Sequence, residues 1–413
     1  MGVRGLQTYL ERHCPEACGK VNLTELARQY YRQHGTRPVM VVDGLGCLRK
    51  LYNRELPWVY GGQWREYFKE LRHFLHSFRT ADIDLVFIFD GVVEKSKRAE
   101  WAKRRQQSAR DVITVFNHIK KHGTQPSDDL FQMPVSLGTL TRFALKSLEQ
   151  NCRQMSGDEE ITFEVDVEEI RPRVDAKVLH VRPVVGKNAV KEWCPYRGNP
   201  LTRPDVVTAL PLDVPGGTPS LAMLWFSTDG PRAQHLRLHT FFACMDSVGL
   251  LEGVLRVEPE PCYIIMCLVL HYMVKHMLTL QEWEVDAFLA QAVVPFAQDV
   301  GWLRGLKVPR VAPRPVHLAA VFLKGVSYAL LADCACGWPI TVQDGMPWNY
   351  FDGKLFHYKY LMAQGGADVR ALCDHDDTAL QLFWTLKKFV TFGTRLDQKR
   401  RQIPHQQGTG SNY

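Results

Sequence analysis

The chain has 413 residues and a formal net charge of +7, with 46% hydrophobic and 23% charged residues. This composition is ordinary for a globular protein, and the length predicts two or three domains. No run of about 20 uncharged apolar residues occurs, and the N-terminus lacks a long apolar core, so we expect neither a membrane span nor secretion. Residues 1–123 hold 22 Lys and Arg against 13 Asp and Glu. This concentration of positive charge suggests an anionic partner for the N-terminal part.

Residues 1–149 are predicted to alternate helices and strands. This order is typical of a parallel sheet with right-handed crossovers, so we expect an α/β domain. In chain order, the expected elements are a helix from Leu6, a helix over Leu23–Tyr31 capped by Asn22 or Thr24, a strand over Pro38–Asp43, an amphipathic helix over Trp64–Phe78, a strand over Asp84–Asp90, and a basic helix over about Lys95–Lys121.

The character of the chain changes after residue 149. Residues 150–218 begin with an acidic stretch at 157–169 and become rich in Pro and Gly, which predicts a linker with short strands. Residues 397–413 are basic and polar and are predicted to form a disordered tail.

Residues 219–396 are predicted to form a mainly α-helical domain. An aromatic segment over 346–362 should pack onto it, and we expect its Asp352 and His357 to be buried rather than catalytic. The long apolar helices are expected over 235–251, 262–278, 282–297 and 316–336.

Two aspartates end the two predicted strands. Asp43 and Asp90 are each followed by a glycine, which allows a tight turn into the next helix. In α/β sheets, binding and catalytic residues lie at the carboxyl ends of the parallel strands. These two carboxylates could therefore supply half of a magnesium site for the hydrolysis of phosphodiesters. The alternative is that each aspartate caps the turn or helix that follows it.

Basic residues follow Asp90 directly. On a helix beside a phosphodiester site they would bind backbone phosphates, and the interleaved Trp101 could stack on a base. The alternative is a solvated helix face. The candidate nucleic-acid-binding residues are Lys95, Lys97, Arg98, Lys103, Arg104 and Arg105.

These motifs carry a resemblance. The start MGVRGL, the strand end VVDGLGCL and FIFDG with its basic helix are similar to the N-terminal half of the XPG/flap-endonuclease superfamily, which has a PIN-like domain. The resemblance implies that Asp43 and Asp90 bind magnesium and that the basic helix lines a gateway for single-stranded nucleic acid. Active members add a second acidic cluster on later strands and a glycine-rich helix–two-turn–helix. The sequence shows neither, so the domain is predicted to be partial, its metal site vestigial and catalysis absent.

A closer resemblance covers about residues 1–149 and 170–400. The words MGVRGLQ, GGQWREYF, Gly198–Leu201, Met346–Asn349 and Phe351–His357 are similar to the constitutive coactivator of peroxisome proliferator-activated receptor gamma family. Members are usually much longer between these two blocks. The resemblance implies a nuclear coactivator that binds a nuclear receptor ligand-binding domain and acts in adipocyte differentiation. Related members resemble RNA-binding scaffolds.

Three functions follow, in order of preference. The first is a non-enzymatic nuclear coactivator that needs no cofactor, with residual Mg²⁺ binding left open. The alternatives are a magnesium-dependent structure-specific nuclease, completed by carboxylates within 158–169, and a scaffold that binds RNA or single-stranded nucleic acid without catalysis. A sheet without its later strands would expose apolar surface, so we also expect extensive contact between residues 1–149 and the C-terminal region.

Overall fold

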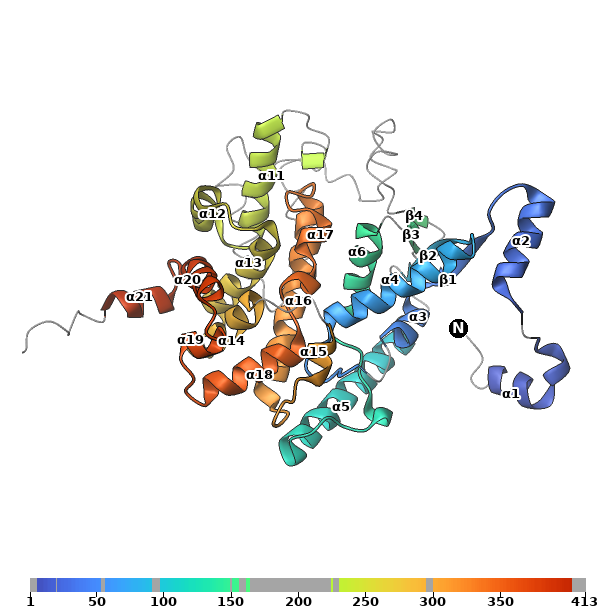
Figure 1. Cartoon of the computed structure of the whole chain (residues 1–413), viewed down its shortest axis with the longest axis horizontal. Helices are drawn as coiled ribbons and strands as arrows, with labels where there is room; N and C mark the ends of the chain where they lie inside the picture. The colour runs from blue at the N-terminus through green and yellow to red at the C-terminus, as the bar shows by residue number, and fades with distance from the viewer. Residues whose placement is uncertain are drawn as a thin grey trace, which may run out of the picture.

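The computed structural model describes residues 6–19, 21–52, 56–90, 97–148, 151–155, 161–163, 224–225, 230–294 and 300–402. Figure 1 shows an α/β part, drawn from blue to green, beside a helical part drawn from yellow to red. The prediction of an α/β N-terminal region followed by a mainly helical C-terminal region is confirmed.

The sheet has four strands in the order β1-β2-β3-β4. These are β1 (Val39–Asp43), β2 (Asp84–Asp90), β3 (Asn151–Met155) and β4 (Ile161–Phe163). The first three are parallel, whereas β4 pairs antiparallel with β3. The last two strands come from the segment assigned above to a linker, so the sheet continues beyond residue 149.

The N-terminal helices follow the predicted pattern. The side chain of Asn22 caps α2 by accepting hydrogen bonds from the backbone N–H groups of Thr24 and Glu25 at 3.0 and 3.3 Å. The apolar positions of α4 place Trp64, Tyr67 and Leu71 in the core. The elements are α1 (Leu6–His13), η1 (Pro15–Ala17), α2 (Leu23–His34), α3 (Gly44–Leu51), α4 (Trp64–Thr80), α5 (Arg98–His122), η3 (Asp128–Leu130) and α6 (Leu137–Ser147).

The C-terminal part is a packed group of helices. They are α11 (Gly230–Cys244), η4 (Val248–Leu250), α12 (Leu251–Val257), α13 (Pro261–His276), α14 (Glu282–Val293), α15 (Val300–Gly305), α16 (Pro313–Ala335), α17 (Val342–Gly345), η5 (Pro347–Asn349), α18 (Gly353–Gln364), α19 (Val369–Leu372), α20 (Asp377–Thr391) and α21 (Arg395–Gln402).

Two expectations about these helices were wrong in detail. The helix expected over 235–251 is interrupted after Cys244, because Asp246 takes a left-handed conformation with φ of 53° that an α-helix cannot continue through. The tail predicted to be disordered from Asp397 begins as helix α21, and residues 403–413 lie outside the described part.

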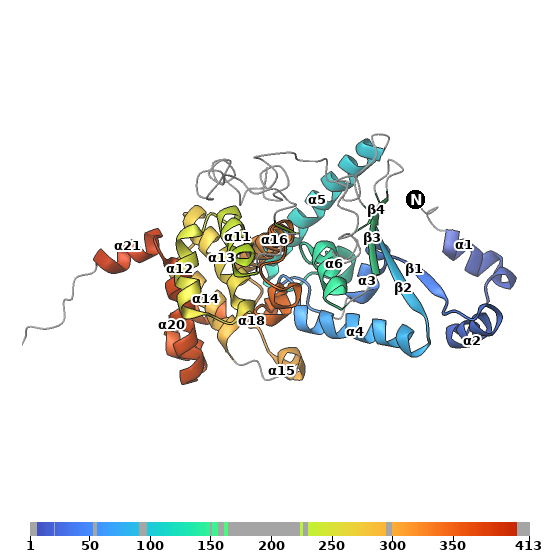
Figure 2. The same ribbon diagram turned by 90° about the horizontal axis from the view of Figure 1, so that it is seen from above.

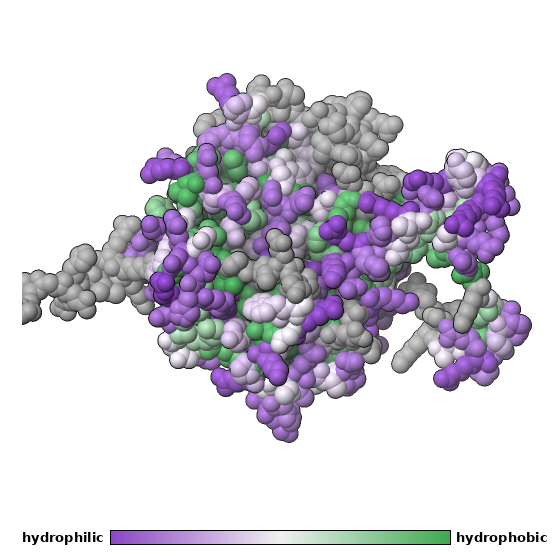
Figure 3. All heavy atoms as spheres, viewed as in Figure 1, coloured by the Kyte–Doolittle hydropathy of each residue, from purple (hydrophilic) through white to green (hydrophobic). Residues whose placement is uncertain are grey.

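Helix α16 is the core helix of this region. By length and composition it could cross a membrane, and it is the one such helix among the described residues. However, 67% of its apolar window is buried by neighbouring helices such as α13 and α18. Figure 3 shows hydrophilic and apolar residues mixed over the visible face of the molecule.

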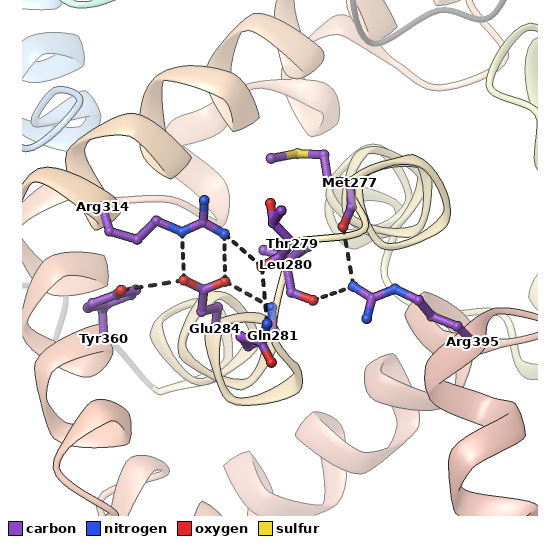
Figure 4. Close-up of polar contacts among 8 residues, drawn as sticks. All are labelled: Met277, Thr279, Leu280, Gln281, Glu284, Arg314, Tyr360 and Arg395. Atoms are coloured by element: carbon purple, nitrogen blue, oxygen red, sulfur yellow. Dashed lines mark hydrogen bonds and ion pairs between the residues drawn. The ribbon is translucent and has the colours of Figure 1, made fainter.

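An ion pair between the buried Glu284 and the partly exposed Arg314 fixes the start of α14, as Figure 4 shows. Glu284 binds the Arg314 guanidinium through both carboxylate oxygens, at 2.8 and 3.0 Å. It also completes a capping box by accepting the Gln281 N–H at 2.9 Å. These hydrogen bonds raise the pKa of Arg314 above its usual range. On the other side, Arg395 donates to the carbonyls of Met277 and Leu280 and so ties α21 to the same turn.

The two parts of the chain share one continuous hydrophobic core. Phe68 of α4 stacks on Trp348 with ring centroids 3.8 Å apart and planes 11° from parallel. Beside this pair, the Arg65 Nε donates to the Trp348 carbonyl at 2.9 Å. Arg304 pairs with Glu66, which is buried, at 3.1 Å. The expected extensive contact between residues 1–149 and the C-terminal region is therefore confirmed.

A backbone contact makes this junction close. The Gly353 N–H donates to the Gly62 carbonyl at 3.0 Å, which joins the start of α18 to the loop before α4. A Cβ atom at Gly353 would lie 2.3 Å from the Tyr60 carbonyl oxygen. A side chain at this position would therefore separate the two parts.

Candidate metal carboxylates and basic surfaces

Asp43 caps the helix that follows its strand. Its Oδ1 accepts the Gly46 N–H at 2.8 Å, and its side chain is the N-cap of α3. Gly44 leaves room in this turn for the Phe89 ring, because a Cβ at Gly44 would lie 2.6 Å from that ring. The alternative interpretation of Asp43 as a cap is thus what the structure shows for this residue.

Asp90 ends the neighbouring strand at the same edge of the sheet. Asp43 pairs with Ile88, and Asp90 lies two residues further along β2. Its side chain, the following glycine and Lys95 lie outside what the structure describes. The backbone register therefore brings both predicted residues to the carboxyl edge of the parallel strands.

The third strand contributes no carboxylate to this edge. Met155 is the residue of β3 that pairs with Asp90, and the rest of the strand is Asn151, Cys152, Arg153 and Gln154. The carboxylates at 158–160 and 164–169 lie outside the described residues. Across the described chain, no group of three or more His, Cys, Asp or Glu side chains could hold a metal. The described residues at this edge thus do not fit a two-metal site.

The basic helix α5 projects from the α/β part. All residues from Lys97 to Arg110 are exposed, whereas Val115 and Ile119 anchor the second half in the core. Arg104 pairs with Glu100 at 3.2 Å, and the Arg105 guanidinium lies 4.7 Å from the Trp101 ring centroid. One face of that indole is consequently covered by a cation within its own helix.

An arginine-lined cavity lies between α3, α5 and α6. Its volume is about 650 Å³, and its walls combine Arg49, Arg104 and Arg142 with apolar side chains such as Phe89. Of these arginines, Arg104 is the one that belongs to the predicted nucleic-acid-binding residues. Arg49 lies on α3 and Arg142 on α6, and no local sequence pattern indicates that these helices pack against α5.

Asp352 and His357 are buried, as predicted. Asp352 caps α18 by accepting the Leu355 N–H at 3.0 Å, and burial raises its pKa to about 7. His357 accepts the Ala312 N–H at 3.0 Å, and burial lowers its pKa to about 4. His357 also contacts the loop of the α/β part that contains Tyr60, whose ring meets the imidazole edge-on with centroids 4.9 Å apart.

The chain is similar to proteins that are named constitutive coactivators of peroxisome proliferator-activated receptor gamma, or PPAR-gamma-like coactivators. It is 25% identical to the constitutive coactivator of peroxisome proliferator-activated receptor gamma from Bos taurus, over 94% of this chain and 95% of that protein. It is 46% identical to the Homo sapiens protein of the same name over 164 residues, 39% of this chain and 18% of that protein. The constitutive coactivator of PPAR-gamma-like protein 1 from Mus musculus is 38% identical over 52% of this chain and 19% of its own length.

These relatives confirm the resemblance to the constitutive coactivator of peroxisome proliferator-activated receptor gamma. The resemblance to the XPG/flap-endonuclease superfamily stays a prediction. The alignment with the bovine protein covers 669 positions, more than the 413 residues of this chain, so long stretches of that protein have no counterpart here. The human match spans about a fifth of the human protein. No family model and no solved structure matches the chain.

Proposed function

We propose that the chain is a non-enzymatic transcription coactivator that binds the ligand-binding domain of a nuclear receptor of the peroxisome proliferator-activated receptor gamma type. The observation that carries this proposal is the similarity to the named bovine coactivator over 94% of the chain, which includes both the α/β and the helical part. A nuclear location and a role in adipocyte differentiation belong to the same proposal.

The experiment is a direct binding measurement with the full chain and the purified receptor ligand-binding domain, followed by a reporter assay in cells. We expect saturable binding and raised transcription that depends on both proteins. The ligand-binding domain of an unrelated nuclear receptor serves as the control. Absence of binding, or equal binding to the control domain, would contradict the proposal.

We further propose that the α/β part is a degenerate nuclease-like domain of PIN-like type. Supporting this, Asp43 is engaged in a helix cap and β3 carries no carboxylate beside Asp90. Titration of the full chain with Mg²⁺ should show no binding in the millimolar range, and flap or single-stranded substrates should stay intact. Magnesium-dependent cleavage that Asp43→Ala abolishes would instead support the nuclease alternative.

A second candidate function is binding of RNA or single-stranded nucleic acid without catalysis. The observation that favours it is the gathering of three arginines around one cavity at the base of the exposed half of α5. Binding should weaken steeply with salt, and Lys103→Ala, Arg104→Ala and Arg105→Ala together should reduce affinity. Unchanged affinity in this triple variant would count against the idea.

A further inference from the structure

A continuous basic stripe runs along the outer face of α4. Its members are Arg65, Lys69, Arg72, His76 and Arg79, with His73 beside them. Their spacing of four, three, four and three residues places the five side chains within an arc of about 80° on the helix. At 1.5 Å per residue the stripe is ~21 Å long. Apart from the half-buried Arg65, these side chains are exposed.

The carboxylates of α4 do not neutralise this stripe. Glu66 and Glu70 lie on another face of the helix, where both contact Arg304 from the helical part. Among the residues that the structure describes, no carboxylate pairs with Lys69, Arg72, His73 or His76. The positive charge of Lys69 and Arg72, at the centre of the stripe, is therefore available to an external anion.

The stripe lies in a groove with an apolar wall. The groove has a volume of about 430 Å³ and includes Phe68, Leu75 and Leu148 beside the basic residues. At one end of the groove, the Arg79 guanidinium donates a hydrogen bond to the Leu148 carbonyl at 3.2 Å. In Figure 1 α4 lies toward the viewer, and Figure 2 shows α5 on the opposite side of the molecule. The stripe is thus a separate surface from the basic helix α5.

The spacing of the basic residues and the lining of the groove favour a protein helix over a nucleic acid strand. Carboxylates at helical spacings of three and four residues repeat every ~5 Å, which is also the repeat of the stripe. The apolar wall would receive the apolar edge of the same helix. A single strand of nucleic acid gains from stacking on exposed aromatic rings. The aromatic ring in this groove, Phe68, has one face stacked on Trp348 and the Arg72 guanidinium 5.9 Å from its centroid.

We propose that the outer face of α4 is a docking site for an acidic amphipathic helix of a partner protein. The partner carries glutamates or aspartates in a 4-3-4-3 pattern, with apolar residues along the adjoining edge. Each ion pair at such an exposed site contributes little, so affinity depends on the whole row engaging together. This surface does not rest on the proposed contact with a nuclear receptor.

The test uses the full chain and two fluorescein-labelled helical peptides of identical composition. One peptide carries five glutamates in the 4-3-4-3 pattern beside a leucine edge, and the other distributes the same residues around all faces. Circular dichroism first verifies that both are equally helical. Fluorescence anisotropy should show at least tenfold tighter binding of the patterned peptide.

Charge reversal locates the site. Lys69→Glu with Arg72→Glu should weaken binding of the patterned peptide at least tenfold. The matched control is Arg28→Glu with Arg32→Glu on the exposed face of α2, which changes the net charge equally and should alter affinity less than twofold. No binding by the unaltered chain, equal binding of both peptides, or equal loss in both variants would overturn the proposal.

An oligouridine competitor separates the two classes of anion. At equal concentrations of phosphate and carboxylate charge, it should displace less than a tenth of the patterned peptide. Displacement comparable to that by the unlabelled peptide would overturn the proposal and identify the stripe as a nucleic-acid surface.

Discussion

Trp348 is predicted to hold the α/β and helical parts together, and Trp348→Ala tests this directly. The indole is 8% exposed, and its ring stacks at 3.8 Å on Phe68 from the other part. Burying a ring of this size removes ~200 Å² from water, worth up to about 5 kcal/mol at ~25 cal/mol per Å². The bond from Arg65 uses the Trp348 backbone carbonyl, so it survives the substitution. We therefore expect a loss of about 3–5 kcal/mol in the free energy of unfolding.

The measurement is urea unfolding of the full chain followed by circular dichroism at 222 nm. Because the core is continuous across the junction, the unaltered chain should unfold in one transition. Trp302→Ala is the matched control, since this indole on α15 is 43% exposed. The same area arithmetic gives up to about 3 kcal/mol for it, so its loss should be smaller than that of Trp348→Ala.

Two results would refute this reasoning. Separate transitions for the α/β and helical parts in the unaltered chain would show that the junction does not couple them. A loss for Trp348→Ala no larger than that for Trp302→Ala would show that the stacked pair adds little to stability.

Three further substitutions probe other contacts. Asp43→Ala removes the α3 cap and should lower the free energy of unfolding by about 1 kcal/mol. Asp43→Asn keeps a capping oxygen and should change this free energy little. Equal losses for the two variants in a thermal melt would contradict the capping role. Glu284→Ala leaves the guanidinium of Arg314 without its carboxylate and should cost about 2–3 kcal/mol in a urea titration, against less than about 0.5 for the exposed Glu252→Ala. His357 is neutral when folded, with a pKa of about 4 against an ordinary 6.5, so the unfolded chain binds more protons between these values and stability falls as pH drops through this window. Between pH 7 and pH 5, the free energy of unfolding should fall by about 2 kcal/mol less in His357→Gln than in the unaltered chain. Identical dependence of this free energy on pH in the two proteins would refute the role of burial.

Local patterns predicted the N-terminal elements well. The cap at Asn22 and the three-and-four spacing of apolar residues in α4 act within one or two turns, so they can be read without the fold. The break at Asp246 could not be read in this way. Its carboxylate bonds to Lys275 and His276 of α13, and this tertiary contact accompanies the left-handed turn.

The candidate site was predictable in part. Both aspartates were expected at one sheet edge, and the register of β1 and β2 brings them there. An aspartate after a strand can bind metal or cap a helix, and the sequence does not distinguish these roles. The bond from Gly46 shows that Asp43 caps α3 with one carboxylate oxygen, Oδ1. Metal binding by Asp43 stays a prediction. The positions of Arg49 and Arg142 in the cavity depend on how α3, α5 and α6 pack together, which the sequence alone does not show. The stripe on α4, by contrast, follows from a spacing that was readable in the sequence.

The position of β1 in the sheet has a consequence for the behaviour of the chain in solution. It is an edge strand, and Val39 and Val41 are 61% and 67% exposed. Such an edge can template the addition of a strand from another molecule, which leads to aggregation. The strand is only five residues long, and Pro38 precedes it while the charged Asp43 ends it. Besides capping α3, Asp43 thus acts as a gatekeeper: a charge at the end of this strand discourages one molecule from extending the sheet of the next.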